Sequence, residues 1–234
     1  MTYVLVPGAG GDASYWHRVV PLLERDGERV VAVELPTEDP EAGLAAYADA
    51  IVAATCDAAG GATDVTLVAQ SMGAFSAPLA YDRLDVRRIV LVNAMVPRPG
   101  ETPGDWWEAT GQVAARREHE TAEGRDPDAP FDVREWFFHD VPPEVTRESF
   151  ARAEKGQADR PFGEPWPLAA WPDAPTAGVA GRDDRLFPVE FQRRVVRERL
   201  GLEIDVMPGG HLVALSQPQE LADRLEGYRA AAGA

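Results

Sequence analysis

Short apolar runs alternate with longer helical segments in the first half of the chain, and this alternation restricts the fold more than any other feature. Four runs, nearly continuous in Val, Leu, Ile or Ala, are expected to be strands: residues 2–6, 29–33, 65–69 and 88–92. Three segments between and after them have helical composition: residues 15–26, 41–59 and 73–84. Continuous apolar runs are typical of strands buried on both faces. The pattern predicts right-handed crossovers and a doubly wound, mostly parallel α/β sheet.

The alternation stops over residues 96–172. This stretch is rich in proline and charge and holds five of the six tryptophans, at positions 106, 107, 136, 166 and 171. The alternation then resumes with expected strands at 176–180 and 202–206 and expected helices at 189–200 and 212–229. We therefore predict a single domain with a core of residues 1–95 and 173–234. Residues 96–172 would be a helical cap inserted after the fourth predicted strand.

Charge and hydropathy exclude several classes of partner. The chain has 39 acidic and 23 basic residues, a net charge of −16, whereas nucleic acids and anionic membranes bind clustered positive charge. No apolar run approaches the roughly 18 residues of a membrane span. The apolar run at residues 3–6 is too short for a signal peptide and has no basic residues before it. We expect a cytoplasmic protein that binds neither nucleic acid nor membranes.

Metal and disulfide chemistry are not indicated either. The four histidines are dispersed, and Cys56 is the single cysteine, so no metal-ligand spacing is present. We expect neither a metal nor a cofactor. Cys56 lies in a predicted helix, and we expect it to be a buried small side chain.

A serine follows the third predicted strand in the string Ala69-Gln70-Ser71-Met72-Gly73. A nucleophile at the tip of a sharp strand–turn–helix needs small residues two positions before and two after it, because strand and helix approach closely there. Isolated strings of this pattern are common. The position between an apolar strand and a helix is what predicts that Ser71 is a nucleophile. Pro78 removes one donor from that helix and is expected to disturb it.

A base and an acid are predicted at the same edge of the sheet. His211 is the one histidine that follows a predicted strand, through a Pro-Gly-Gly turn. Asp183 and Asp184 follow the strand predicted at 176–180. The carboxyl ends of parallel strands meet at one edge, where active sites gather. The chain order Ser, Asp, His agrees with a nucleophile on such a turn. Either aspartate could orient His211, and the other would hold a turn or cap a helix.

Two backbone N–H groups are needed to stabilise an oxyanion. Met72, directly after the serine, would supply one. The glycine-rich loop after the first strand, residues 7–11, would supply the other from Ala9. The alternative, a phosphate-binding loop, has neither the GxGxxG spacing nor a Walker lysine here.

Aromatic side chains in the predicted cap could form an apolar pocket for the substrate. The candidates are Trp106, Trp107, Trp136 and Phe137. The alternative, that they pack the cap onto the sheet, is at least equally expected for each.

Taken together, these residues resemble the hydroxynitrile lyase and plant methylesterase branch of the α/β-hydrolase superfamily. The resemblance covers most of the chain outside the predicted cap and rests on these strings: 4–9, 20–24, 33–36, 70–73, 184–192 and 209–211. It implies that Asp184 is the acid, eight residues before Gln192, and that Ala9 is an oxyanion donor. The chain departs from the family at Pro7, where a histidine is usual, and at Ala69, where a glycine is usual.

The branch divides by chemistry. The lyases carry a lysine directly after the catalytic histidine and a hydroxyl residue at the first oxyanion position, where this chain has Leu212 and Ala9. Without that cation a cyanide leaving group lacks its stabilising charge. The resemblance therefore implies a serine hydrolase, a carboxylesterase acting on a small-molecule ester. Three alternatives stay open: C–C cleavage or cyclisation on the same triad, a peroxidase-type activity without cofactor, and a binding protein on a hydrolase fold. A homodimer is also left open.

Overall fold

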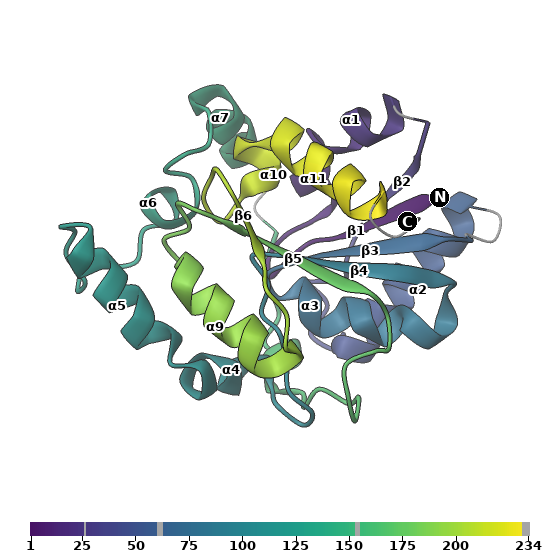
Figure 1. Ribbon diagram of the computed structural model, residues 1–234, viewed down its shortest axis with the longest axis horizontal. Coiled ribbons are helices and arrows are strands. Elements are labelled where there is room, and N and C mark those ends of the chain that lie inside the picture. The colour runs from purple at the N-terminus through teal and green to yellow at the C-terminus, as the bar shows by residue number, and fades with distance from the viewer. Residues whose placement is uncertain (26, 60–62, 153–154, 231–234) are drawn as a thin grey trace.

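One parallel sheet of six strands forms the centre of the protein (Figure 1). The computed structural model describes residues 1–25, 27–59, 63–152 and 155–230. The strand order is β2-β1-β3-β4-β5-β6, and every neighbouring pair is parallel. The strands are β1 (Thr2–Val6), β2 (Arg29–Ala32), β3 (Val65–Gln70), β4 (Val86–Val92), β5 (Thr176–Gly181) and β6 (Asp205–Met207). The predicted doubly wound, mostly parallel α/β fold is confirmed.

Helices cover both faces of the sheet, because successive strand residues point to opposite sides. Along β1, Tyr3 and Leu5 pack in one apolar cluster, whereas Val4 and Val6 pack in the other. The first cluster lies under α1 (Val20–Arg25), α10 (Val213–Ser216) and α11 (Pro218–Ala230). The second lies under α2 (Leu44–Ala59), α3 (Gly73–Ser76) and α9 (Val189–Leu200). Burial on both faces explains why the strands are nearly continuous in apolar residues.

Three predicted helices are broken where a backbone donor is missing or a turn intervenes. The helix predicted at 73–84 is α-helical only to Ser76 and continues as a 3₁₀ helix, η2 (Ala77–Arg83). Pro78 has no N–H to donate, as the sequence indicated. The helix predicted at 212–229 is divided before Pro218 into α10 and α11. The helix predicted at 15–26 is a 3₁₀ turn, η1 (Ala13–Trp16), followed by α1, and residue 26 lies outside the described residues.

Two further expectations are wrong in detail. The sixth strand begins at Asp205 rather than at residue 202 and ends at Met207. Cys56 is exposed, not buried. Helix α2 buries Leu44, Tyr47, Ile51 and Thr55, which are three or four positions apart, and Cys56 lies beside this stripe on the side facing water.

The segment between β4 and β5 adds five helices among the described residues: α4 (Pro103–Thr110), α5 (Gln112–Ala122), α6 (Val133–Phe137), α7 (Pro143–Ala151) and α8 (Arg160–Gly163). Two fully buried indoles attach this segment to the core. The Trp106 ring packs against Phe187 and Phe191 of the core, and its Nε1–H donates within the segment to the Val96 carbonyl at 3.0 Å. The Trp166 Nε1–H donates to the Phe75 carbonyl at 3.1 Å. No helix in the described part of the chain is long and apolar enough to cross a membrane.

Replacing Trp106 by alanine is expected to lower the free energy of unfolding by about 3–5 kcal/mol, because the loss of a large, fully buried side chain leaves a cavity. Trp107 is only half-buried, and Trp107→Ala is the matched control with an expected loss of less than half as much. Urea denaturation of the two variants measures both values. A smaller loss at Trp106 than at Trp107 would contradict the packing role.

Candidate active site

Ser71 lies at the tip of a sharp turn between β3 and α3. Its φ is +50°, a left-handed conformation that is uncommon for residues other than glycine and marks a constrained position. The backbone is held there from both sides: the Ser71 N–H donates to the Val92 carbonyl and the Met95 N–H donates to the Ser71 carbonyl, each at 3.0 Å. The turn thus places the side chain beyond the carboxyl end of the sheet.

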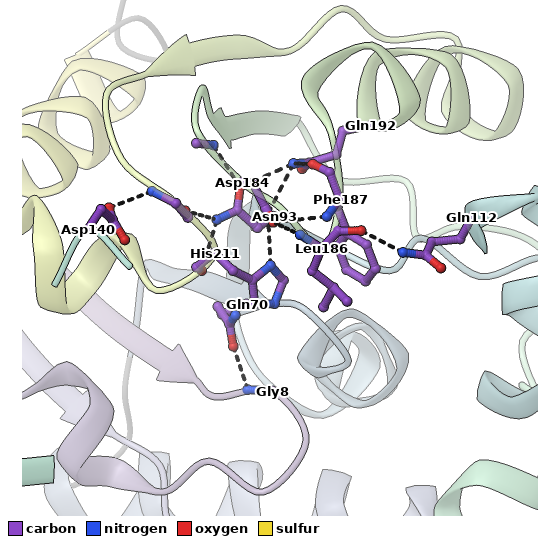
Figure 2. Close-up of polar contacts among 12 residues, drawn as sticks. Gly8, Gln70, Asn93, Gln112, Asp140, Asp184, Leu186, Phe187, Gln192 and His211 are labelled. Carbon is purple, nitrogen blue, oxygen red and sulfur yellow. Dashed lines mark hydrogen bonds and ion pairs between the residues drawn. The ribbon is translucent and has the colours of Figure 1, made fainter. Parts of the chain in front are cut away.

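Glycines next to this turn allow the loop after β1 to approach it. A Cβ at Gly73 would lie 2.7 Å from the Pro7 carbonyl oxygen, and a Cβ at Gly8 would lie 2.8 Å from the Ser71 Cβ. The Gly8 N–H also donates to the buried Gln70 Oε1 at 2.9 Å (Figure 2). Side chains at positions 8 and 73 would therefore push the loop away from the serine.

The two predicted oxyanion donors are brought together by this approach. Ala9 and Met72 line the same narrow pocket beside the turn, together with Tyr47 and Ser76. Within the described residues, neither the Ala9 N–H nor the Met72 N–H donates a hydrogen bond. Both N–H groups are therefore without an acceptor among the described residues.

A buried hydrogen bond joins His211 to Asp184. The His211 Nδ1 lies 2.8 Å from the Asp184 Oδ2, and the side chains are 2% and 0% exposed. The other carboxylate oxygen, Oδ1, accepts the N–H groups of Leu186 at 2.8 Å and Phe187 at 2.9 Å (Figure 2). A carboxylate removed from water needs such donors to stay charged. The loop after β5 provides them.

The neighbouring aspartate has a different role. The Asp183 carboxylate accepts the Gly209 N–H at 3.2 Å and pairs with Arg182. Burial opposes the charge, but the Arg182 guanidinium and the Gly209 N–H together hold the pKa of Asp183 below its ordinary value. Asp183 thus holds the turn before His211, and of the two aspartates it is Asp184 that hydrogen-bonds to the imidazole.

Asn93 is a functional candidate that the sequence analysis missed. It follows β4 directly, is fully buried and has a φ of +45°. Its Nδ2 donates to the carbonyls of Gly210 and His211 at 3.0 Å, and its Oδ1 accepts the Gly181 N–H at 2.7 Å. Asn93 therefore fixes the loop that carries His211 to the end of β5. Its place at the carboxyl end of a strand was the signal that could have found it.

Gln192 was also missed as a site residue, although the resemblance used it as a marker. Its Nε2 lies 3.4 Å from the Asp184 Oδ2 and 2.7 Å from the Phe187 carbonyl. The amide therefore supports the carboxylate from α9. Gln192 lies about one helical turn after Pro188, to whose carbonyl its N–H donates at 3.0 Å, and this places its side chain on the side of α9 that faces the loop of Asp184.

The four aromatic candidates separate in the structure. The Phe137 ring contacts the His211 ring edge-on, with centroids 5.3 Å apart, as does Phe187 at 5.0 Å. The fully buried Trp106 packs against Phe187 and Phe191 instead. Trp107 contacts Trp106, and Trp136 lies under the Arg116 guanidinium and against Phe131. The packing alternative therefore fits the three tryptophans, and Phe137 is the candidate at the site.

The chain is similar in sequence and in fold to several known hydrolases. The alpha/beta hydrolase family model matches residues 3–224. The chain is 27% identical over 248 residues to a pyrethroid hydrolase of Sphingobium wenxiniae, covering 96% of this chain and 86% of that protein. Polyneuridine aldehyde esterase has a similar fold, with a TM-score of 0.76, 20% identity and coverage of 97% and 98% of the two chains. So does the methylesterase MES16 of Arabidopsis, with a TM-score of 0.74, 19% identity and coverage of 98% and 99%.

The resemblance inferred from the sequence is thereby confirmed at the level of the superfamily, and a plant methylesterase is among the proteins of similar fold. Within the described residues, no group of three His, Cys, Asp or Glu side chains is placed to hold a metal ion. Since the family model covers nearly the whole chain, this protein belongs to the alpha/beta hydrolase family.

Proposed function

We propose that this protein is a carboxylesterase that cleaves a small ester by acyl transfer to Ser71, with His211 as base and Asp184 as the acid that orients it. The family is one of hydrolases, and the proteins named above comprise a pyrethroid hydrolase, an esterase and a methylesterase. The observation that carries the residue assignment is the buried hydrogen bond between Asp184 and His211. It lies at the same edge of the sheet as the turn of Ser71, as a Ser-His-Asp triad requires.

In the first half of the reaction the Ser71 Oγ attacks the ester carbonyl carbon while His211 Nε2 takes its proton. Asp184 holds the Nδ1–H, so that Nε2 carries the lone pair. The N–H groups of Ala9 and Met72 donate to the oxyanion of the tetrahedral intermediate. The intermediate collapses to an acyl-enzyme, and His211 gives its proton to the leaving alkoxide, which departs as the alcohol.

In the second half His211 takes a proton from water, whose oxygen attacks the acyl carbon. A second tetrahedral intermediate forms on the same two N–H groups and releases the carboxylic acid and the free Ser71 hydroxyl. The segment of residues 96–172, which we propose as the cap, supplies Phe137 beside His211. We expect that ring to contact the substrate.

The residues beside the base favour hydrolysis over lyase chemistry. Leu212 follows His211 and provides no cation for a cyanide leaving group. Lys155, the single lysine of the chain, is paired with Asp12 and Glu34. The proposal assigns protonation of the released anion to His211 itself, which suits an alkoxide.

Replacing Ser71 by alanine is expected to lower kcat by roughly 10⁴-fold or more, because the nucleophile is lost while the fold is kept. Wild-type protein is first screened on short p-nitrophenyl and methyl esters, with acid and alcohol identified as products. The variant is then measured on an accepted ester. Turnover comparable to wild type in Ser71→Ala would contradict the proposal, and cleavage to products other than acid and alcohol would favour the lyase alternative.

Asp184→Asn and Asp183→Asn form a matched pair. The first removes the charge that holds the imidazole tautomer and is expected to lower kcat by about 10³–10⁴-fold. The second keeps an oxygen that can accept the Gly209 N–H, so we expect a loss of less than about 10-fold. Steady-state kinetics on the same ester decide between them. A larger loss at Asp183 would overturn the assignment of the acid.

A further inference from the structure

The inserted segment contacts both loops that carry the proposed acid and base. Residues 135–140, here called the clamp segment, run from the end of α6 towards α7. On one side, the Arg185 Nη1 donates to the Glu135 carbonyl at 2.9 Å and to its carboxylate at 3.0 Å. On the other, the Gly210 N–H donates to the Asp140 Oδ2 at 2.6 Å (Figure 2). Arg185 follows Asp184 and Gly210 precedes His211, so the clamp segment joins the neighbours of both residues.

The side chains of His139 and Asp140 approach the Gly210 backbone closely. A Cβ at this position would lie 2.8 Å from the Asp140 Oδ1 and 2.8 Å from the His139 Nε2. Both atoms are buried and have no hydrogen-bond partner among the described residues. The absence of a side chain at Gly210 is therefore what lets the two polar side chains pack against this turn.

His139 and Asp140 are neighbours in the clamp segment, and both face the Gly210 turn. Burial, and after it the positive charge of Arg185, lower the pKa of His139 despite the opposing effect of Asp140. The His139 imidazole is accordingly neutral at neutral pH. Of the two side chains it is Asp140 that accepts the Gly210 N–H, at 2.6 Å.

The core holds the rest of the same turn. Asp183 accepts the Gly209 N–H, and Asn93 donates to the Gly210 carbonyl. The Gly210 N–H is the remaining backbone donor before His211, and its acceptor comes from the inserted segment, 70 residues away in the chain. The turn that carries the imidazole is therefore completed only when the clamp segment is in place.

We propose that Asp140 is a positioning residue for the base: its hydrogen bond to the Gly210 N–H fixes the turn so that His211 stays aligned between Asp184 and Ser71. The inference rests on the proposed function of His211. Asp140 acts through the backbone of the turn and does not contact the reacting atoms. It links the docking of the inserted segment to catalysis, because a displaced clamp segment would release the turn.

The test compares Asp140→Ala with Asp140→Asn. The amide oxygen of asparagine can still accept the Gly210 N–H, whereas alanine cannot. For Asp140→Ala we expect kcat to fall roughly 10- to 100-fold, since a displacement of about 1 Å of a catalytic group costs about that much. KM should change less than about 2-fold, and the rate of Ser71 labelling by a fluorophosphonate should fall with kcat. Asp140→Asn should restore both rates to within about 3-fold of wild type.

Glu164→Ala is the matched control. The Glu164 carboxylate, also in the inserted segment, accepts the Leu44 N–H at 2.7 Å, a bond of the same kind to α2 and not to the turn. We expect Glu164→Ala to lower the melting temperature about as much as Asp140→Ala does, and to leave kcat within about 2-fold of wild type.

Gly210→Ala tests the same contact with a second variant, which is needed if Asp140→Ala does not fold. It displaces the clamp segment without deleting a polar group and should lower kcat similarly. Unchanged kcat in Asp140→Ala, or a loss equal to that of Glu164→Ala, would overturn the inference. So would an asparagine variant as slow as the alanine variant. Wild-type protein that is not labelled at Ser71 would instead overturn the proposed function.

Discussion

The buried hydrogen bond between Asp184 and His211 is the interaction on which the rest of the site depends. A carboxylate with no exposed surface needs several hydrogen-bond donors, because the interaction with one imidazole does not offset the free-energy cost of removing the charge from water. Two N–H groups of the loop after β5 and the amide of Gln192 meet that need. The start of α9 and the end of β5 are therefore fixed by the same charge that fixes the imidazole.

A second constraint is close approach of the backbone at the carboxyl edge of the sheet. The loop after β1 lies against the turn of Ser71 only because Gly8 and Gly73 have no side chains. A Cβ at Gly181 would likewise lie 2.3 Å from the Gly210 carbonyl oxygen. Asn93, between these loops, hydrogen-bonds to both Gly181 and Gly210. The loops that carry the proposed nucleophile, base and acid are thus in close contact with neighbouring loops at this edge of the sheet.

Features that depend on a local sequence pattern were predicted, whereas side-chain roles that depend on contacts between distant residues were missed. Continuous apolar strands and the small residues around Ser71 are local, and they predicted the sheet and the sharp turn. The exposed position of Cys56 was also within reach, because it lies off the buried stripe of α2. The role of Trp106 could not be assigned from the sequence, since a tryptophan in this segment could line a substrate pocket or pack in the core. No pattern relates Asp140 to Gly210, because their hydrogen bond spans 70 residues. Residues that support the site through contacts distant in the sequence can therefore be identified only from the structure.

The most direct test of the account is to trap the acyl-enzyme. Protein is mixed with an ester that acylates faster than it deacylates, quenched in acid and digested, and the peptides are measured by mass spectrometry. The account predicts a mass increase equal to the acyl group on the peptide that contains Ser71. It also predicts no such increase in Ser71→Ala and its disappearance from wild type as the ester is consumed. Turnover without acylation, or acylation at another residue, would contradict it.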